Sequence, residues 1–226
     1  MTFELEREMA VPVSNWLRFQ GLSVKREFSM PWGICDFVGV SLNASRVRKR
    51  LRFGQKNSVG PMGRVALMRQ IPDRETGHRI TLSRLERLNP CPADVLAADL
   101  EKLITAGFVV RWGKRSFQKI NGWVPLHNRI LAVELKLARI SDALVQASSN
   151  RAFATESFVA VPAETACRIV SGRCLSDFLK AGVGVLGVTR TKCEVVLKPS
   201  HTGIETDATL QMHCVERFWR TRDSST

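Results

Sequence analysis

The positive charge of this 226-residue chain is concentrated in one internal block, and this constrains how the chain can fold. Residues 46–120 hold 17 Lys and Arg against 6 Asp and Glu, a net charge of +11, whereas the whole chain carries +13. The flanking segments therefore share a net charge of only +2. A dense basic segment between two nearly neutral ones indicates an insertion. We expect one discontinuous domain, residues 1–45 and 121–226, with residues 46–120 inserted as a basic leader and a second domain.

The excess of positive charge also indicates a polyanionic partner. With a pI near 10.2, nucleic acid is the first candidate and an acidic membrane surface is the second. No apolar run approaches the ~20 residues of a membrane-spanning helix, and the acidic start MTFELERE lacks the pattern of a secretory signal. The six cysteines form no CxxC pair, which is typical of free thiols in a reducing compartment. We therefore expect a cytoplasmic, nucleoid-associated protein.

The periodicity of the apolar residues predicts α/β structure in both flanking segments. Residues 5–17 have apolar side chains at helical spacing, and residues 23–28 and 34–42 alternate as strands do. After the basic block, the same patterns predict strands at 129–137, 157–161, 183–189 and 193–198, and helices at 142–154, 163–181 and 209–220. The fold class predicted for this domain is α/β.

The basic block itself reads as three helices followed by a hairpin. Apolar spacing predicts helices near residues 65–71, 81–88 and 92–106, and Gly107 ends the third. Strands at 108–112 and 116–120 then flank a Gly-Lys-Arg turn. The phrase DLEKLITAGFVVR resembles the third helix and first wing strand of winged-helix DNA-binding domains. The alternative is a small helical domain that binds protein.

Two groups of basic side chains are candidates for contacts with DNA phosphates. The run RVRKRLRFGQK, residues 46–56, is either a solvated loop or an anion-binding segment, because such dense like charges repel without an anion. The exposed side of the third predicted helix is rather acidic, so the wing is the better candidate within the insertion. The candidates are Arg46, Arg48, Lys49, Arg50 and Arg52 in the run, and Arg111, Lys114 and Arg115 in the wing.

The strand ILAVELKL, residues 130–137, carries the first candidate for chemistry. Alternate residues of a strand share a face, so Leu131, Val133 and Leu135 are expected in a core, while Glu134 and Lys136 share the opposite face. An acidic-x-Lys triplet is common by chance, and a polar outer face on an amphipathic strand is the alternative. The triplet gains weight only in combination with a second carboxylate.

That second carboxylate is Asp36, in the predicted strand GICDFVGV. A carboxylate among apolar residues needs a partner, because burying an unpaired charge is costly. The partner is either a basic side chain, in a salt bridge, or a metal ion. Asp36 and Glu134 on adjacent strands could hold a hard cation such as Mg²⁺, while Lys136 could orient a water molecule or stabilise charge on a phosphate.

The order of these elements resembles the PD-(D/E)xK nuclease superfamily. A helix with Glu8, the strand GICDFVGV, the strand AVELKL and the helix ALVQASSNR follow one another as in that superfamily. The phrase REMAVPVSNWLRFQGLSVKREF also resembles bacterial phosphodiesterases of the group. The resemblance covers residues 4–42 and 128–165. Two features depart from the pattern: Asn150 stands where a related exonuclease pattern has Tyr, and no Pro precedes Asp36.

The resemblance implies a restriction-endonuclease-like mixed sheet flanked by helices, with an inserted winged-helix (α+β) domain. Asp36, Glu134 and the backbone carbonyl of Leu135 would bind Mg²⁺ or Mn²⁺. Lys136 would be the catalytic lysine, Glu8 the helix acid and Gln146 the glutamine of the following helix. We expect a metal-dependent deoxyribonuclease that binds duplex DNA. A homodimer is the candidate assembly, since cutting both strands needs two active sites. The alternative is a catalytically inactive DNA-binding regulator on the same fold.

Overall fold

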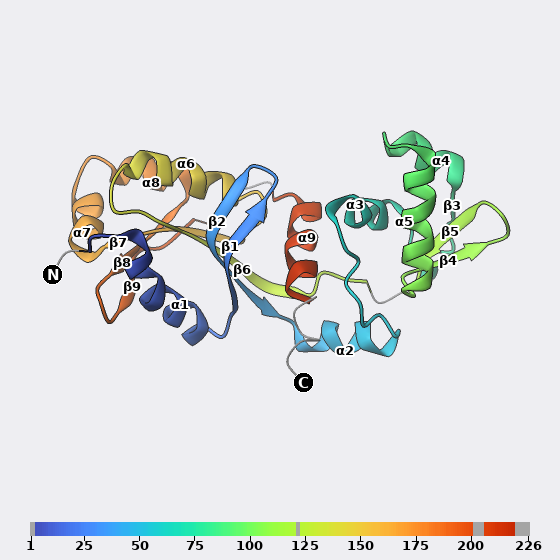
Figure 1. The fold of residues 1–226 in the computed structure, drawn as a ribbon, viewed down its shortest axis with the longest axis horizontal. Helices are drawn as coiled ribbons and strands as arrows, with labels where there is room; N and C mark the ends of the chain where they lie inside the picture. The colour runs from blue at the N-terminus through green and yellow to red at the C-terminus, as the bar shows by residue number, and fades with distance from the viewer. Residues whose placement is uncertain (1–2, 121–122, 201–205, 220–226) are drawn as a thin grey trace. The chain divides into compact units, whose positions relative to one another are not determined.

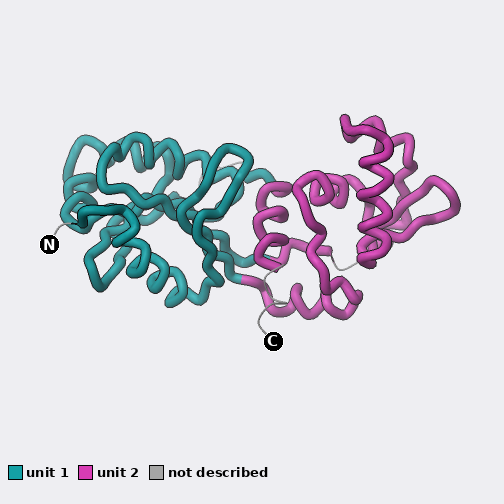
Figure 2. The backbone as a smooth tube through the Cα atoms, in the orientation of Figure 1, with its two compact units in different colours: residues 1–41, 127–207 teal, residues 42–126, 208–226 magenta. Residues whose placement is uncertain are grey.

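The chain divides into two compact units in a computed structural model that describes residues 3–120, 123–200 and 206–219 (Figure 2). Unit 1 comprises Met1–Ser41 and His127–Asp207, and unit 2 comprises Leu42–Leu126 and Ala208–Thr226. The boundaries lie a few residues from the predicted positions 45 and 120. The larger difference is at the C-terminal end, which we assigned to the discontinuous domain but which groups with unit 2.

Unit 1 contains a six-stranded mixed sheet with the strand order β1-β2-β6-β7-β8-β9 (Figure 1). Strands β1 and β2 form an antiparallel hairpin, β6, β7 and β8 run parallel, and β9 is antiparallel to β8. The strands are β1 (Ser23–Met30), β2 (Gly33–Leu42), β6 (His127–Leu135), β7 (Glu156–Pro162), β8 (Gly184–Val188) and β9 (Cys193–Leu197). The mixed α/β architecture predicted from periodicity is confirmed.

Helices cover both faces of this sheet. The turn η1 (Glu6–Met9) and helix α1 (Ala10–Phe19) pack on one face, and α6 (Ile140–Asn150), α7 (Ala163–Ser171) and α8 (Leu175–Ala181) pack on the other. The predicted helix 163–181 is thus two helices, and the break falls at Gly172, where an added Cβ would meet the Arg168 carbonyl at 2.6 Å.

Alternation along the central strands explains this three-layer arrangement. In β7, Phe158 and Ala160 belong to the hydrophobic cluster under α1, whereas Val159 and Val161 belong to the cluster under α6 and α7. Successive strand residues point to opposite faces, so a strand that is apolar throughout must be covered on both sides. In β6, Leu131, Val133 and Leu135 join the α1 cluster, as we predicted from the sequence.

Unit 2 consists of helices around a small antiparallel sheet with the strand order β3-β5-β4. The elements are α2 (Ala44–Arg52), α3 (Met62–Gln70), η2 (Arg74–Thr76), β3 (Ile80–Thr81), α4 (Leu82–Leu88), α5 (Ala93–Thr105), β4 (Val109–Trp112), β5 (Ser116–Lys119) and α9 (Ala208–Trp219). The three predicted helices and the hairpin are all present. The predictions missed β3, because a two-residue strand has no periodicity to detect.

The chain in unit 2 folds around a hydrophobic core of its own. Leu85 in α4, Leu96 and Leu100 in α5 and Phe117 in β5 are all almost fully buried in this core. Met212 of α9 belongs to the same cluster, which explains why the C-terminal helix groups with this unit. Within the described residues, no helix has both the length and the hydrophobicity needed to cross a bilayer.

Candidate functional site

Asp36 is held against the central strand of unit 1 by a backbone hydrogen bond. It lies on β2, which neighbours β6 in the sheet, and its Oδ2 accepts a hydrogen bond from the N–H of Leu135 at 2.7 Å. Its chain neighbours Cys35 and Phe37 are buried. Burial raises the pKa of Asp36, and the Leu135 hydrogen bond and the charge of Lys136 partly offset that rise. The carboxyl group is therefore fixed in position but is costly to ionise.

Glu134 provides a second carboxyl group beside Asp36. Only 3% of its surface is exposed, and its Oε1 accepts a hydrogen bond from Nδ2 of Asn150, at the end of α6, at 2.6 Å. Burial and then the charge of Asp36 raise the pKa of Glu134 to about 7. Burial also raises the pKa of Asp36, and the interaction with Glu134 partly offsets that rise. Residues 98 positions apart in the sequence thus form one buried acidic pair.

Lys136 completes the group, and its partner is Glu6. Lys136 Nζ lies 3.7 Å from Oε2 of Glu6, and the positive charge of Lys136 lowers the pKa of both Asp36 and Glu134. The N–H of Leu137 also donates to Glu6 Oε1, at 3.4 Å. One cation and three carboxyl groups therefore meet at the end of β6.

The acidic residue that the structure brings to this site differs from the one predicted. Glu8 accepts a hydrogen bond from the N–H of Glu4 at 2.9 Å, and that bond is the main reason why the pKa of Glu8 is lowered. The segment forms the 3₁₀ turn η1, not the first turn of a longer α-helix. A 3₁₀ turn holds fewer residues than an α-turn, so it changes which side chains face the sheet. Glu6 is the acid that contacts Lys136.

On helix α6, Asn150 rather than Gln146 bonds to the acidic pair. Gln146 is exposed and lines the hollow above Glu134, whereas Asn150 is buried and donates to Glu134. The two residues are four positions apart and share one face of the helix. A sign of this role for Asn150 was present in the sequence, because Asn150 stands where the related exonuclease pattern has Tyr.

The acidic pair is chemically suited to a hard divalent cation. Burial raises the pKa of both carboxyl groups, and the charge of Asp36 raises that of Glu134 further, so both would ionise more readily with a cation between them. Within the described residues, no group of three or more His, Cys, Asp or Glu side chains is arranged to hold a metal ion. Mg²⁺ typically binds one or two carboxylates and keeps several waters, so a two-carboxylate site fits this ion.

Four of the five basic candidates between residues 46 and 52 lie on an exposed helical surface. The segment forms helix α2, and the side chain of Asn43 caps it by accepting from the N–H groups of Ser45 and Arg46. We define the exposed α2 surface as the side chains of Arg46, Arg48, Lys49 and Arg52. Arg46 also donates to the carbonyl of Pro125 at 2.9 Å.

Arg50 is not a surface residue, and its prediction as a phosphate contact is wrong. Its side chain is fully buried and forms a two-pronged ion pair with Glu216 of α9, with N···O distances of 2.5 and 3.0 Å. The guanidinium also lies 5.1 Å from the ring of Phe108 and 4.5 Å from that of Trp219. A charge held this way lies in the interior of unit 2 and cannot reach a ligand at the surface.

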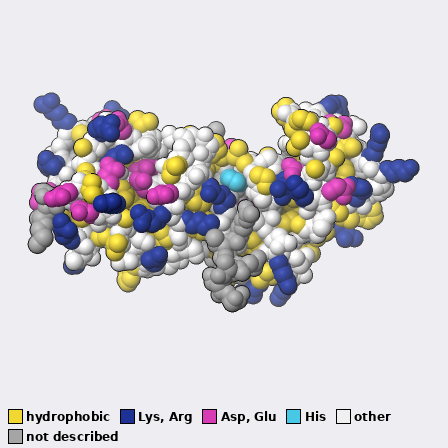
Figure 3. Space-filling model, in the orientation of Figure 1, with side chains coloured by type: hydrophobic (Ala, Val, Ile, Leu, Met, Phe, Trp, Pro, Cys, Tyr) yellow, Lys and Arg dark blue, Asp and Glu magenta, His cyan; other side chains and the backbone are white. Residues whose placement is uncertain are grey.

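The predicted wing residues lie on and beside the turn of hairpin β4–β5. Lys114 and Arg115 are exposed at the turn, and Figure 3 shows Lys and Arg side chains projecting from the end of unit 2 where this hairpin lies. Arg111 is also exposed but forms an ion pair with Glu101 of α5. Of the three predicted wing contacts, Lys114 and Arg115 are the better placed for a ligand.

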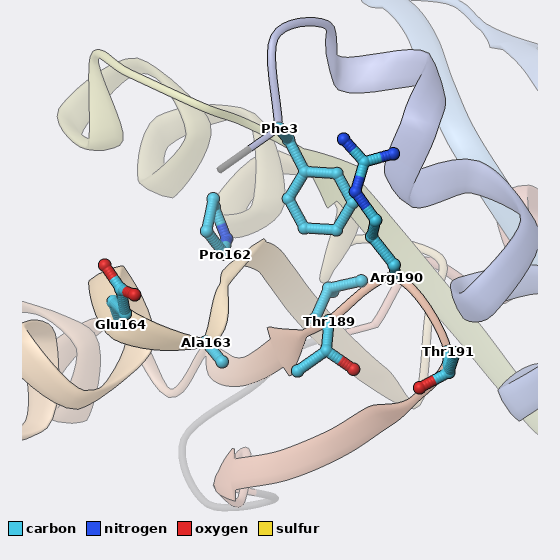
Figure 4. Close-up of a pocket in the computed structure, with 8 residues that line it drawn as sticks. Phe3, Pro162, Ala163, Glu164, Thr189, Arg190 and Thr191 are labelled. Carbon is cyan, nitrogen blue, oxygen red and sulfur yellow. The ribbon is translucent and has the colours of Figure 1, made fainter. Parts of the chain in front are cut away.

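Two hollows in unit 1 differ in their relation to the acidic pair. One, of about 200 Å³, has Glu134 in its wall together with Trp32 and Gln146. The other, of about 390 Å³, lies at the ends of β7 and β8, where Phe3 and Arg190 lie side by side (Figure 4). The larger hollow contains none of the predicted site residues. We therefore assign the smaller hollow to the candidate site.

No protein-family profile matches the chain, and no curated protein is a significant match to it. Among solved structures, a protein of unknown function from Silicibacter pomeroyi matches with a TM-score of 0.41 and 13% sequence identity. The match covers 99% of this chain and 95% of the other. We therefore infer function from the site residues themselves.

Proposed function

We propose that the protein is a metal-dependent deoxyribonuclease of the PD-(D/E)xK type. The observation that carries this proposal is the meeting of Asp36, Glu134 and Lys136 at one end of β6, with the whole of residues 42–126 between the two acids in the sequence. A salt bridge alone would need one carboxylate and one cation. Two neighbouring acids whose pKa values are both raised, first by burial, are the arrangement expected of a cation site.

The residues would divide the chemistry as follows. Asp36 and Glu134, with the backbone carbonyl of Leu135, would hold Mg²⁺ or Mn²⁺. When bound, such a cation polarises the scissile phosphate and lowers the pKa of a bound water molecule. Lys136 would stabilise the negative charge that develops on the phosphate. Glu6 would orient the lysine through their ion pair, and Asn150 would orient Glu134 through its hydrogen bond.

Unit 2 would supply the grip on duplex DNA as a winged-helix module. Three helices, a two-residue strand and a hairpin in the sheet order β3-β5-β4 support this assignment. The exposed α2 surface and the turn residues Lys114 and Arg115 would contact phosphates without reading sequence. The exposed side of α5 is acidic, which argues against the reading of bases by that helix. Two of its acids are neutralised by ion pairs, Asp99 with Arg64 and Glu101 with Arg111.

The second candidate function is that of a DNA-binding regulator without catalytic activity. The burial of Glu134 favours it, because only 3% of the residue is exposed and its carboxyl group is already hydrogen-bonded. On this alternative, the acidic pair would be a relic of the nuclease site and unit 2 would carry the function.

A cleavage assay separates the two candidates. Purified protein is incubated with labelled linear, nicked and branched DNA, with and without Mg²⁺ or Mn²⁺. We expect cleavage that requires the cation and that Lys136→Ala abolishes. Binding to all three substrates without cation-dependent cleavage of any would refute the nuclease and favour the regulator. Equal cleavage by the Lys136→Ala variant would identify a contaminating nuclease.

A further inference from the structure

The hollow beside Glu134 has exposed apolar walls, which the chemistry proposed above does not use. Trp32, Ile34 and Val145 all line it, and their exposed fractions are 43%, 61% and 67%. Single exposed apolar residues are ordinary on protein surfaces. Three of them around one hollow of about 200 Å³, with a buried carboxylate in its wall, indicate a place where an apolar ligand group sits.

The indole of Trp32 is held in position at the turn of the β1–β2 hairpin. The ladder of that hairpin closes with Met30 opposite Gly33, so Trp32 lies in the tight turn. Its ring packs at 38° on Phe153, with 6.1 Å between the ring centroids, and its Nε1 donates to Oδ1 of Asn150 at 3.4 Å. A half-exposed aromatic ring fixed from behind is a preformed stacking surface.

Asn150 couples this aromatic surface to the proposed catalytic group. The same amide accepts from the Trp32 indole and donates to Glu134 at 2.6 Å. One side chain therefore sets the position of both the ring and the carboxylate. A ligand group stacked on Trp32 would therefore be separated from the acidic pair by the side chain of Asn150 alone.

The polar part of the hollow suits a flat ligand with donors and acceptors at its edge. Gln146 lines the hollow and is exposed, so its amide can both donate and accept. Ser149 lies three positions after Gln146 on α6 and lines the same hollow. Its hydroxyl donates to the carbonyl of Val145 at 3.1 Å, so its oxygen can act as an acceptor. An aromatic face with amide and hydroxyl groups at its rim is how proteins hold single unstacked bases.

We propose that Trp32, with Ile34, Val145 and Gln146, binds one unstacked nucleobase next to the scissile phosphate. This inference rests on the proposed nuclease function, which places the phosphate at Glu134 and Lys136. A base within a duplex is stacked on both faces, so it could reach Trp32 only if it were unpaired or displaced. The substrate is therefore DNA with an unpaired nucleotide at the point of cleavage, such as a duplex with a single-stranded overhang.

Binding without cleavage tests this inference separately from the nuclease activity. Fluorescent duplexes that are blunt or carry a short overhang are titrated with the full-length protein in EDTA, and the overhang contains 2-aminopurine. We expect the overhang duplex to bind roughly tenfold more tightly than the blunt one, which is the range of one base–aromatic stack. We also expect the fluorescence of 2-aminopurine to fall on binding. Trp32→Ala should abolish both effects, and Trp32→Phe should retain most of each.

Phe19→Ala is the matched control, because Phe19 is 90% exposed on the helix that packs on the opposite face of the sheet. It should leave the overhang preference unchanged. Equal affinity for blunt and overhang duplexes, or a Trp32→Ala variant that behaves as wild type, would overturn the inference. A protein that binds the overhang and quenches 2-aminopurine but never cleaves would refute only the proposed catalysis. Failure to bind either DNA would refute both proposals.

Discussion

The carboxylate of Asp36 accepts a hydrogen bond from the backbone N–H of Leu135 at 2.7 Å, which joins two positions 99 residues apart. This bond connects β2 to β6 at the point where the two strands carry their acidic residues. It places Asp36 beside Glu134 and within the electrostatic influence of Lys136.

Asp36→Asn should abolish cleavage while leaving the fold intact. The amide oxygen can still accept the Leu135 hydrogen bond, but the side chain loses the negative charge that a divalent cation requires. We expect turnover to fall by at least about 100-fold, with little change in DNA affinity. Single-turnover cleavage and equilibrium binding measure the two effects. A variant that loses both equally would show that Asp36 holds the fold and not a cation.

Glu134 should make the metal-free protein less stable as the pH rises. Its pKa is raised from 4.5 to about 7, so the folded state keeps this proton at pH values where the unfolded chain has lost it. The stabilisation is present below about pH 4.5 and is lost as the pH rises through about 7, a change of about 3 kcal/mol. The raised pKa of Asp36 acts in the same direction.

Urea unfolding in EDTA across this pH range measures the effect. Glu134→Gln retains an acceptor for Asn150 and should remove most of the decline relative to wild type. Added Mg²⁺ should restore stability to wild type at the alkaline end and not to the variant. If the stability of the wild-type protein changes between pH 5 and pH 7 in the same way as that of the variant, the prediction is contradicted.

Arg50→Met should destabilise unit 2, because it leaves Glu216 buried without its cation. Breaking a buried ion pair by removing one partner costs about 3–5 kcal/mol. Arg48→Met, on the exposed side of the same helix, should change the free energy of unfolding by less than about 0.5 kcal/mol. Chemical denaturation of the two variants compares them directly. Equal effects would mean that the Arg50–Glu216 pair contributes nothing to stability.

Reversing the charge of Arg48, Lys49 and Arg52 together should weaken DNA binding without changing turnover at saturating DNA. Each lost phosphate contact should reduce the slope of log affinity against log salt by about one. Fluorescence anisotropy at several salt concentrations gives this slope. The matched control reverses three exposed basic residues of unit 1: Arg168 on α7, Arg173 between α7 and α8, and Lys180 on α8. If the control changes the slope as much, the α2 surface has no special role in binding.

The sequence predicted the helices and strands better than it predicted the long-range contacts of individual side chains. Alternation in residues 130–137 predicted β6 and its core-facing side chains, and the three apolar patterns of the basic block predicted α3, α4 and α5. Both predictions depend on neighbours along the chain, where strand and helix periodicity act directly. The acidic pair was also within reach, because each carboxylate interrupts an apolar strand and so requires a partner.

Side chains that look alike in the sequence were separated only by the tertiary structure. Arg50 stands among exposed basic residues in one short run, but it alone meets Glu216, 166 positions later, in the core of unit 2. In the same way, the turn η1 brings Glu6 rather than Glu8 to Lys136. Chain patterning sets which segments are helices, strands and apolar faces, because those preferences are local. Which charge is buried, and beside what, depends on residues that only the folded chain brings together.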